Sequence, residues 1–204
     1  MSPRPLRIGV FGGAFDPPHR AHRALAEAAI RELNLDRLHI LPTGQAWHRR
    51  QAPVPAEHRL AMCRLAFEGL AGALVDDREL RRVGPTYTVD TLLELRRARP
   101  DAEWLLVLGE DQARALTSWH RWPELLTLAE LAIAVRPPPA GAAPSLDPRE
   151  GLPPGARARL LPLPPMPVSA TEIRTRIAEG AGIDHLVGPA VAGYIARHHL
   201  YRPA

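Results

Sequence analysis

Two histidines three residues apart, His19 and His22, follow an apolar run and the glycine pair Gly12 and Gly13. Glycines at a turn between a strand and a helix let phosphate oxygens approach backbone N–H groups, and a helix N-terminus favours such an anion electrostatically. Residues three apart share one helix face, so both imidazoles should project over the same anion. A zinc site would need a third ligand, and no residue stands at a suitable spacing. The segment therefore predicts phosphate binding, and it lacks the G-x-G-x-x-G spacing of dinucleotide oxidoreductases.

A second segment, with the sequence VSATEIR, has the same character. Ser169 followed by Glu172 forms a capping box, which predicts the start of a helix. The hydroxyls of Ser169 and Thr171, the first-turn amides and the guanidinium of Arg174 all suit phosphate. Alone, the segment fits an ordinary capped helix with a solvated arginine slightly better than a functional site. Two phosphate-suited helix starts in one small domain favour a functional role for this segment.

Short apolar runs alternate with longer segments of helical periodicity, which is typical of a parallel sheet covered by helices. The runs predict strands over residues 7–11, 37–41, 73–76, 103–108 and 131–135, with a further short strand around 159–163. The periodic segments predict helices over residues 20–33, 55–70, 88–97, 171–179 and 189–198. We therefore expect an α/β fold with right-handed crossovers.

The composition excludes several chemistries. All 26 cationic side chains are arginines, so neither a P-loop lysine nor a Schiff-base lysine is available. The arginines are scattered among acidic residues and the formal net charge is +4, which favours small anionic ligands over nucleic acid. The single cysteine, Cys63, excludes an internal disulfide. We expect a cytoplasmic protein, because no segment resembles a signal peptide or a membrane span.

The length of 204 residues predicts a single domain over residues 1–204. Prolines and glycines concentrate in residues 136–167, which we expect to form a loop or an insertion. A C-terminal helical part should follow over residues 169–200.

Several segments, in chain order, resemble the motifs of a known family. Residues 9–22, GVFGGAFDPPHRAH, resemble the G-G-x-F-D-P-x-H-x-G-H signature of the nucleotidyltransferase superfamily, and residues 168–174 resemble its companion S/T-S/A-T-x-I-R motif. Residues 84–92, GPTYTVDTL, are similar to the P-S-Y-T-x-x-T-L segment of bacterial nicotinate-nucleotide adenylyltransferases. Their I/L-G-x-D, T-W-Y/H-x-W/Y and terminal G-L-Y motifs are matched by LGED at 108–111, SWHRW at 118–122 and LYR at 200–202.

This resemblance implies a fold and a reaction. The fold would be a Rossmann-like doubly wound parallel sheet with flanking helices and a C-terminal helical segment. The family transfers the adenylyl group of ATP, with Mg²⁺, to nicotinate mononucleotide and forms nicotinate adenine dinucleotide and pyrophosphate. The mononucleotide phosphate attacks the α-phosphorus directly, so catalysis would rest on alignment and charge stabilisation.

The resemblance also implies roles for individual residues. The catalytic residues would be His19, His22 and Arg174. The residues that would bind ATP are Gly12, Gly13, Phe15, Asp16, His48, Gly109, Asp111, Ser169 and Thr171. The residues that would bind nicotinate mononucleotide are Thr86, Tyr87, Trp119 and Arg136. Trp119 would stack on the pyridine ring, although its position is also consistent with a plain core residue. No metal site on the protein is implied, since Mg²⁺ would arrive with the ATP phosphates.

The sequence departs from the family pattern at two places. Ala21 replaces the glycine of H-x-G-H and brings a methyl group into a tight turn. The family's P-P-H-K/R loop corresponds to residues 45–49, QAWHR, which keep His48 and Arg49 but lack the prolines.

Other functions stay open at this point. Pantetheine-phosphate adenylyltransferases share the glycine-rich turn but carry threonine at the position of His19. Cytidylyltransferases and nicotinamide-preferring relatives differ by a few contacts, whereas class I aminoacyl-tRNA synthetases depend on lysines that this chain lacks. A catalytically silent nucleotide-binding regulator could share the fold, and the arginine count alone supports a nucleic-acid-binding module. The sequence does not decide whether the chain forms a homo-oligomer.

Overall fold

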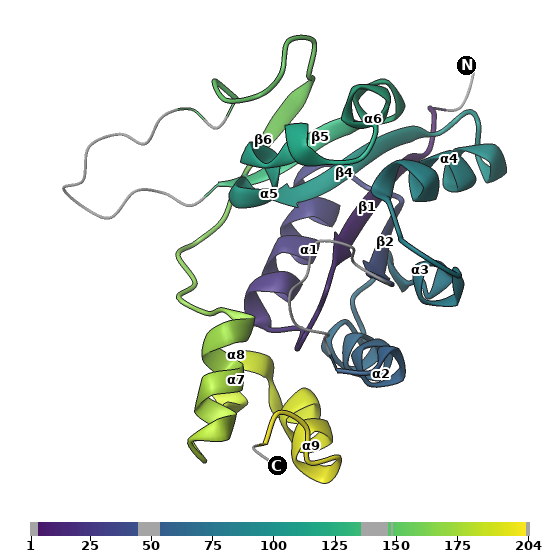
Figure 1. The fold of residues 1–204 in the computed structure, drawn as a ribbon. Helices are drawn as coiled ribbons and strands as arrows, with labels where there is room; N and C mark the ends of the chain where they lie inside the picture. The colour runs from purple at the N-terminus through teal and green to yellow at the C-terminus, as the bar shows by residue number, and fades with distance from the viewer. Residues whose placement is uncertain (1–3, 45–53, 136–146, 148, 203–204) are drawn as a thin grey trace.

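The sheet contains six parallel strands in the order β3-β2-β1-β4-β5-β6 (Figure 1). The computed structural model describes residues 4–44, 54–135, 147 and 149–202. The strands are β1 (Arg7–Gly13), β2 (Arg37–Pro42), β3 (Ala73–Val75), β4 (Glu103–Gly109), β5 (Glu130–Val135) and β6 (Ala158–Pro162). This is a doubly wound order, in which the direction of winding reverses between β1 and β4. The expected α/β, Rossmann-like class is confirmed.

The central strands are buried on both faces, and their side chains alternate between two separate cores. In β4, Leu105 and Val107 belong to one core, whereas Trp104, Leu106 and Leu108 belong to the other. A strand buried on both faces has a nearly continuous apolar sequence, because successive side chains point to opposite sides. This explains why the sequence shows apolar runs here.

Helices cover both faces of the sheet (Figure 1). The first core contains residues of α1, α2, α7, α8 and α9, and the second contains residues of α4, α5, α6 and the short 3₁₀-helix η1. The helices are α1 (Arg20–Glu32), α2 (Ala56–Ala66), α3 (Arg78–Arg81), α4 (Thr88–Ala98), α5 (Glu110–Arg114), η1 (Leu116–Ser118), α6 (Trp122–Leu128), α7 (Ala170–Ala178), α8 (Asp184–Val187) and α9 (Pro189–Arg197). Figure 1 shows α7, α8 and α9 as a group beside α1 and α2, which matches the expected C-terminal helical segment.

The expected elements are found, with shifts at their ends. β1 continues two residues beyond the predicted end at residue 11, and β6 confirms the short strand expected around 159–163. The helix expected over 55–70 ends at Ala66, and Gly69 follows in a left-handed conformation with φ 71°. Five short helices were not predicted, namely α3, α5, η1, α6 and α8. With at most seven residues each, they contain too little periodicity to be recognised.

Parts of two expected segments, 45–53 and 136–148, lie outside the described residues, apart from residue 147. Within the described part of the chain, no helix is long and apolar enough to cross a membrane. Cys63 is fully buried in the first core, and burial raises the pKa of its thiol. The thiol therefore stays protonated and packs as a small apolar side chain.

Candidate active site

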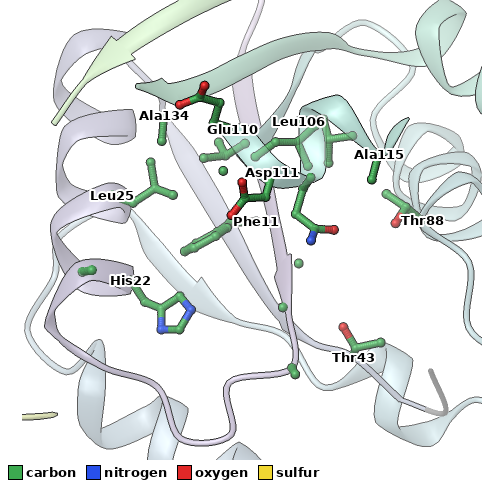
Figure 2. A pocket seen from close by; sticks show the side chains of 18 of the residues that line it. Phe11, His22, Leu25, Thr43, Thr88, Leu106, Glu110, Asp111, Ala115 and Ala134 are labelled. Atoms are coloured by element: carbon green, nitrogen blue, oxygen red, sulfur yellow. The ribbon is translucent and has the colours of Figure 1, made fainter. Parts of the chain in front are cut away.

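A cleft of about 740 Å³ opens at the carboxyl ends of β1 and β4, where the strand order reverses. In open α/β sheets this is the position at which ligands bind. Figure 2 shows His22 and Leu25 of α1 on one side of the cleft and Thr43 and Thr88 on the other, with Asp111 above. A Cβ atom added to Gly12 would meet no atom within 4 Å, so this glycine leaves room for a ligand beside the backbone.

His19 and His22 form a stacked pair at the start of α1. Their ring centroids lie 3.7 Å apart with an interplanar angle of 27°, and both residues line the cleft. The backbone N–H of His19 donates to Nδ1 of His22 at 3.2 Å. Because Nδ1 accepts this bond, the neutral ring of His22 carries its proton on Nε2.

Burial lowers the pKa of His22 well below 6.5, and the neighbouring His19 lowers it further. The ring is therefore neutral at pH 7 and can donate Nε2–H without adding a charge. Phe15 packs edge-on against this ring, with centroids 5.0 Å apart, although Phe15 itself has the left-handed φ of 49°. The aromatic contact holds the imidazole in one orientation.

The turn between β1 and α1 is held by side chains from distant segments. The carboxylate of Asp16 accepts hydrogen bonds from the Tyr201 hydroxyl at 2.7 Å and from the Val54 N–H at 3.4 Å. Its carbonyl oxygen accepts from Nη1 of Arg174 at 2.7 Å. Nη1 of Arg59 donates to the carbonyl oxygens of Ala14 and Thr43, at 3.0 Å and 2.8 Å. These bonds fix the turn that follows Gly12 and Gly13, the last residues of β1.

The start of α7 lies at the same cleft as the start of α1. The Ser169 hydroxyl accepts the N–H of Glu172 at 3.1 Å, as the predicted N-cap requires, and Ser169 lines the cleft. Nη2 of Arg174 donates to the Thr171 hydroxyl at 3.2 Å. The two helix starts singled out in the sequence therefore converge on one cleft.

The far end of the cleft has an aromatic and hydroxyl-bearing wall. Thr86, Tyr87 and Trp119 line it, and the rings of Tyr87 and His120 lie 4.2 Å apart. The Thr86 side chain is 7% exposed, and its Oγ1 has no hydrogen-bond partner among the described residues. An unsatisfied buried hydroxyl is costly, so a ligand that bonds to it would bind favourably.

Residues 10–176 match the profile of the cytidylyltransferase-like family. The chain is 53% identical over 198 residues to a protein of Albidiferax ferrireducens named "Probable nicotinate-nucleotide adenylyltransferase", covering 97% of this chain and 99% of the relative. The chain belongs to the nicotinate-nucleotide adenylyltransferases. A relative of the same name from Bordetella avium is 43% identical, with 97% of this chain and 99% of the relative covered.

Solved structures agree on the fold of this adenylyltransferase. Nicotinic acid mononucleotide adenylyltransferase of Plasmodium falciparum, complexed with APC, superposes with a TM-score of 0.77 at 19% identity, over 96% of this chain and 97% of that one. The same protein complexed with NaAD has a TM-score of 0.76 at 20% identity, with the same coverage. The chain is thus a nucleotidyltransferase of NAD biosynthesis with the fold of these enzymes.

The structure of the adenylyltransferase brings most of the predicted site residues together. Those that line the cleft are Gly12, Gly13, His19, His22, Thr86, Tyr87, Gly109, Asp111, Trp119 and Ser169. Phe15 and Asp16 lie in the turn after β1, Arg174 bonds to that turn, and Thr171 bonds to Arg174; these four are not among the residues that line the cleft. His48 and Arg136 lie outside the described residues. Within the described ranges, no group of three or more His, Cys, Asp or Glu residues is arranged to hold a metal ion.

The sequence analysis did not single out three residues of the adenylyltransferase site. Arg59 and Tyr201 hold the turn after β1, and Glu79 lines the cleft from α3. Tyr201 belongs to the terminal LYR, which was matched as a motif but given no role. Glu79 and Arg59 lie in no recognised motif, and only their burial, at 5% and 3% exposure, marks them.

Removing the Tyr201 hydroxyl from the adenylyltransferase should destabilise it. Burial and the Asp16 carboxylate raise the pKa of Tyr201, so the phenol remains a donor. Tyr201→Phe leaves a buried carboxylate with one donor fewer, and we expect the free energy of unfolding in urea to fall by about 2 kcal/mol. Tyr194→Phe is the control, because it loses only a contact of 3.0 Å with His58. Equal losses in the two variants would contradict the role given to Tyr201.

Proposed function

We propose that the enzyme transfers the AMP moiety of ATP to nicotinate mononucleotide and releases pyrophosphate and nicotinate adenine dinucleotide. The observation that carries the proposal is the division of one cleft into two ends. A pair of histidines and two helix starts lie at one end, and an aromatic wall with an unsatisfied hydroxyl lies at the other. The P. falciparum neighbours are complexed with APC and with NaAD, which supports nucleotide ligands in this cleft.

The reaction needs no covalent intermediate on the protein. A phosphate oxygen of the mononucleotide attacks the α-phosphorus of ATP in line, a new O–P bond forms, and the bond to pyrophosphate breaks. The described part of the cleft wall presents no cysteine or lysine as a nucleophile. Catalysis then consists of aligning two anions and stabilising the charge of the transferring group.

Different groups of the chain align the phosphates and stabilise their charge. Nε2–H of His22 and the imidazole of His19 face the phosphates, where a neutral donor adds stabilisation without repelling Mg²⁺. The first-turn amides of α7 and its Ser169 meet the triphosphate from the opposite side. Mg²⁺ bound to the ATP phosphates would neutralise part of their charge. Arg174 holds the turn after β1 and has donors left for a phosphate.

At the other end, the pyridine ring of the acceptor stacks on Trp119, and its carboxylate accepts a hydrogen bond from Thr86 Oγ1. Gly109, at the end of β4, and Asp111, in the first turn of α5, lie beside the adenosine, and the Asp111 carboxylate accepts from a ribose hydroxyl. His48 and Arg136 are proposed to contact ATP and the acceptor phosphate respectively, on the strength of the motif resemblance alone.

Pyrophosphate release tests this function. With ATP and Mg²⁺, we offer nicotinate mononucleotide, nicotinamide mononucleotide and phosphopantetheine in parallel. We expect kcat/KM for the nicotinate form to exceed that for the amide by at least about tenfold, because a site built to bond a carboxylate discriminates against its neutral analogue. Preference for another acceptor would overturn the substrate. ATP binding without turnover of any acceptor would favour a silent nucleotide-binding protein.

A further inference from the structure

Glu79 of α3 lines the cleft and is buried, with an exposed fraction of 5%. Its side chain accepts a hydrogen bond from the Thr91 hydroxyl at 2.8 Å, and the backbone N–H of Gly44 lowers its pKa slightly. Thr91 is a fully buried residue of α4, and Gly44 follows the end of β2. Glu79 therefore contacts two segments: its carboxyl bonds to the helix that follows Thr86 and Tyr87, and its backbone carbonyl packs against Gly44 in the loop after β2.

The packing around Gly44 brings Glu79 and Thr86 to a common point. A Cβ atom on Gly44 would lie 2.2 Å from the carbonyl oxygen of Glu79 and 2.7 Å from Oγ1 of Thr86. The backbone of Gly44 can approach so closely only because it has no side chain. Oγ1 of Thr86 has no hydrogen-bond partner among the described residues, so no bond fixes its position. Its position therefore depends on the packing contact with Gly44. Thr43, next to Gly44, faces the cleft (Figure 2).

Charged groups surround Glu79 on the side away from the cleft. Nη1 of Arg82 donates to the Thr91 hydroxyl at 3.0 Å, and its Nη2 donates to Glu94 at 2.9 Å. Asp76, at the end of β3, is bonded to Arg78 and to His39 at 2.9 Å each. The positive charges of Arg78 and Arg82 and the negative charges of Asp76 and Glu94 therefore partly offset one another at Glu79.

Burial dominates the titration of Glu79. It raises the pKa to about 7, with Asp76 acting in the same direction and Thr91, Arg82 and Gly44 in the opposite one. The carboxyl group thus changes charge close to neutral pH.

We propose that Glu79 is a positioning residue for the acceptor nucleotide. It holds Gly44 against α4, so that the Thr86 hydroxyl meets the acceptor, and its ionisation weakens the binding of an acceptor that carries a carboxylate and a phosphate. The inference rests on the proposed function, because it assigns this end of the cleft to the acceptor.

The test compares the wild-type enzyme with Glu79→Gln between pH 7 and 9, above the titration of a phosphate monoester. For the wild type, we expect KM for nicotinate mononucleotide to rise by about tenfold over this range, because a unit charge forms near the acceptor at an effective dielectric constant of about 20. Glutamine is neutral and its amide oxygen can still accept from Thr91, so in Glu79→Gln the acceptor KM at pH 7 should be no higher than in the wild type, whose carboxyl is partly ionised at this pH. It should then stay constant up to pH 9, and KM for ATP should not change.

Thr91→Val is the matched second variant, since Thr91 touches the carboxyl from outside the cleft. It removes a donor that favours the charged form, so the midpoint of the acceptor KM profile should move to higher pH. An independent readout is stability. A carboxyl whose pKa rises on folding from 4.5 to about 7 keeps its proton in the folded state. The stability of the wild type relative to Glu79→Gln should therefore fall as the pH rises from 5 to 8.

The outcomes separate the inference from the function on which it rests. The inference is overturned if Glu79→Gln keeps the wild-type pH profile, or if it raises the KM of ATP and of the acceptor equally. Wild-type enzyme that releases no pyrophosphate with nicotinate mononucleotide would refute the proposed function, and with it the assignment of the acceptor end.

Discussion

Alanine in place of His22 should lower kcat for pyrophosphate release by about a hundredfold to a thousandfold, the effect of removing one preorganised donor to a developing charge. The bond from the His19 N–H to Nδ1 directs the proton of His22 to Nε2, and Figure 2 shows the ring directed into the cleft. Burial keeps the ring neutral, so the donor is present throughout the physiological pH range. Since the donor acts mainly on the transition state, KM for ATP should change much less than kcat.

Two controls make this result specific. His185→Ala removes an exposed histidine of α8 that does not line the cleft, and it should leave kcat unchanged. Urea unfolding of His22→Ala checks that the turn after β1 still folds, because the ring also packs against Phe15. If kcat were retained and only KM for ATP increased, His22 would bind the ground state and would not stabilise the transition state.

The strands were predictable because of how they are buried. β4 and β5 have side chains in both cores, so their sequences are continuous apolar runs, which at this length are typical of buried strands. The end of α2 was less predictable, because apolar residues such as Leu70 continue the periodic pattern after the helix has ended, and only Gly69 marks the break. The short helix α3 contains Glu79, which lines the cleft. Its sequence shows no pattern by which the helix could be predicted.

The candidate site was predictable to the extent that it is local in sequence. His19 and His22 come from one turn, and so do Ser169 and Glu172, so their spacing already defines their relative position. The contacts that hold these segments in place join residues far apart in the chain, as Tyr201 and Asp16 are. No periodicity encodes such a contact, because it depends on the path of the whole fold.

The other large effect is expected for Arg174→Ala. The guanidinium donates to the carbonyl oxygen of Asp16 and to Thr171, so it joins the start of α7 to the turn after β1. Its five N–H donors exceed these two bonds, which leaves donors for a phosphate. We expect kcat to fall by about a hundredfold through lost charge stabilisation, and the free energy of unfolding to fall by about 1 kcal/mol through the lost bond to Asp16.

Arg174→Lys separates the two contributions. Lysine keeps the charge but cannot span Asp16 and a phosphate with one planar group, so kcat should recover only in part and stay about tenfold below the wild type. Arg176→Ala is the matched control, because Arg176 lies on the same helix and donates to the Gly182 carbonyl at 3.2 Å, away from the cleft. It should reduce stability slightly and leave kcat intact. If Arg176→Ala reduced kcat as much as Arg174→Ala, the loss would reflect a weakened α7, and Arg174 would have no direct role at the phosphates.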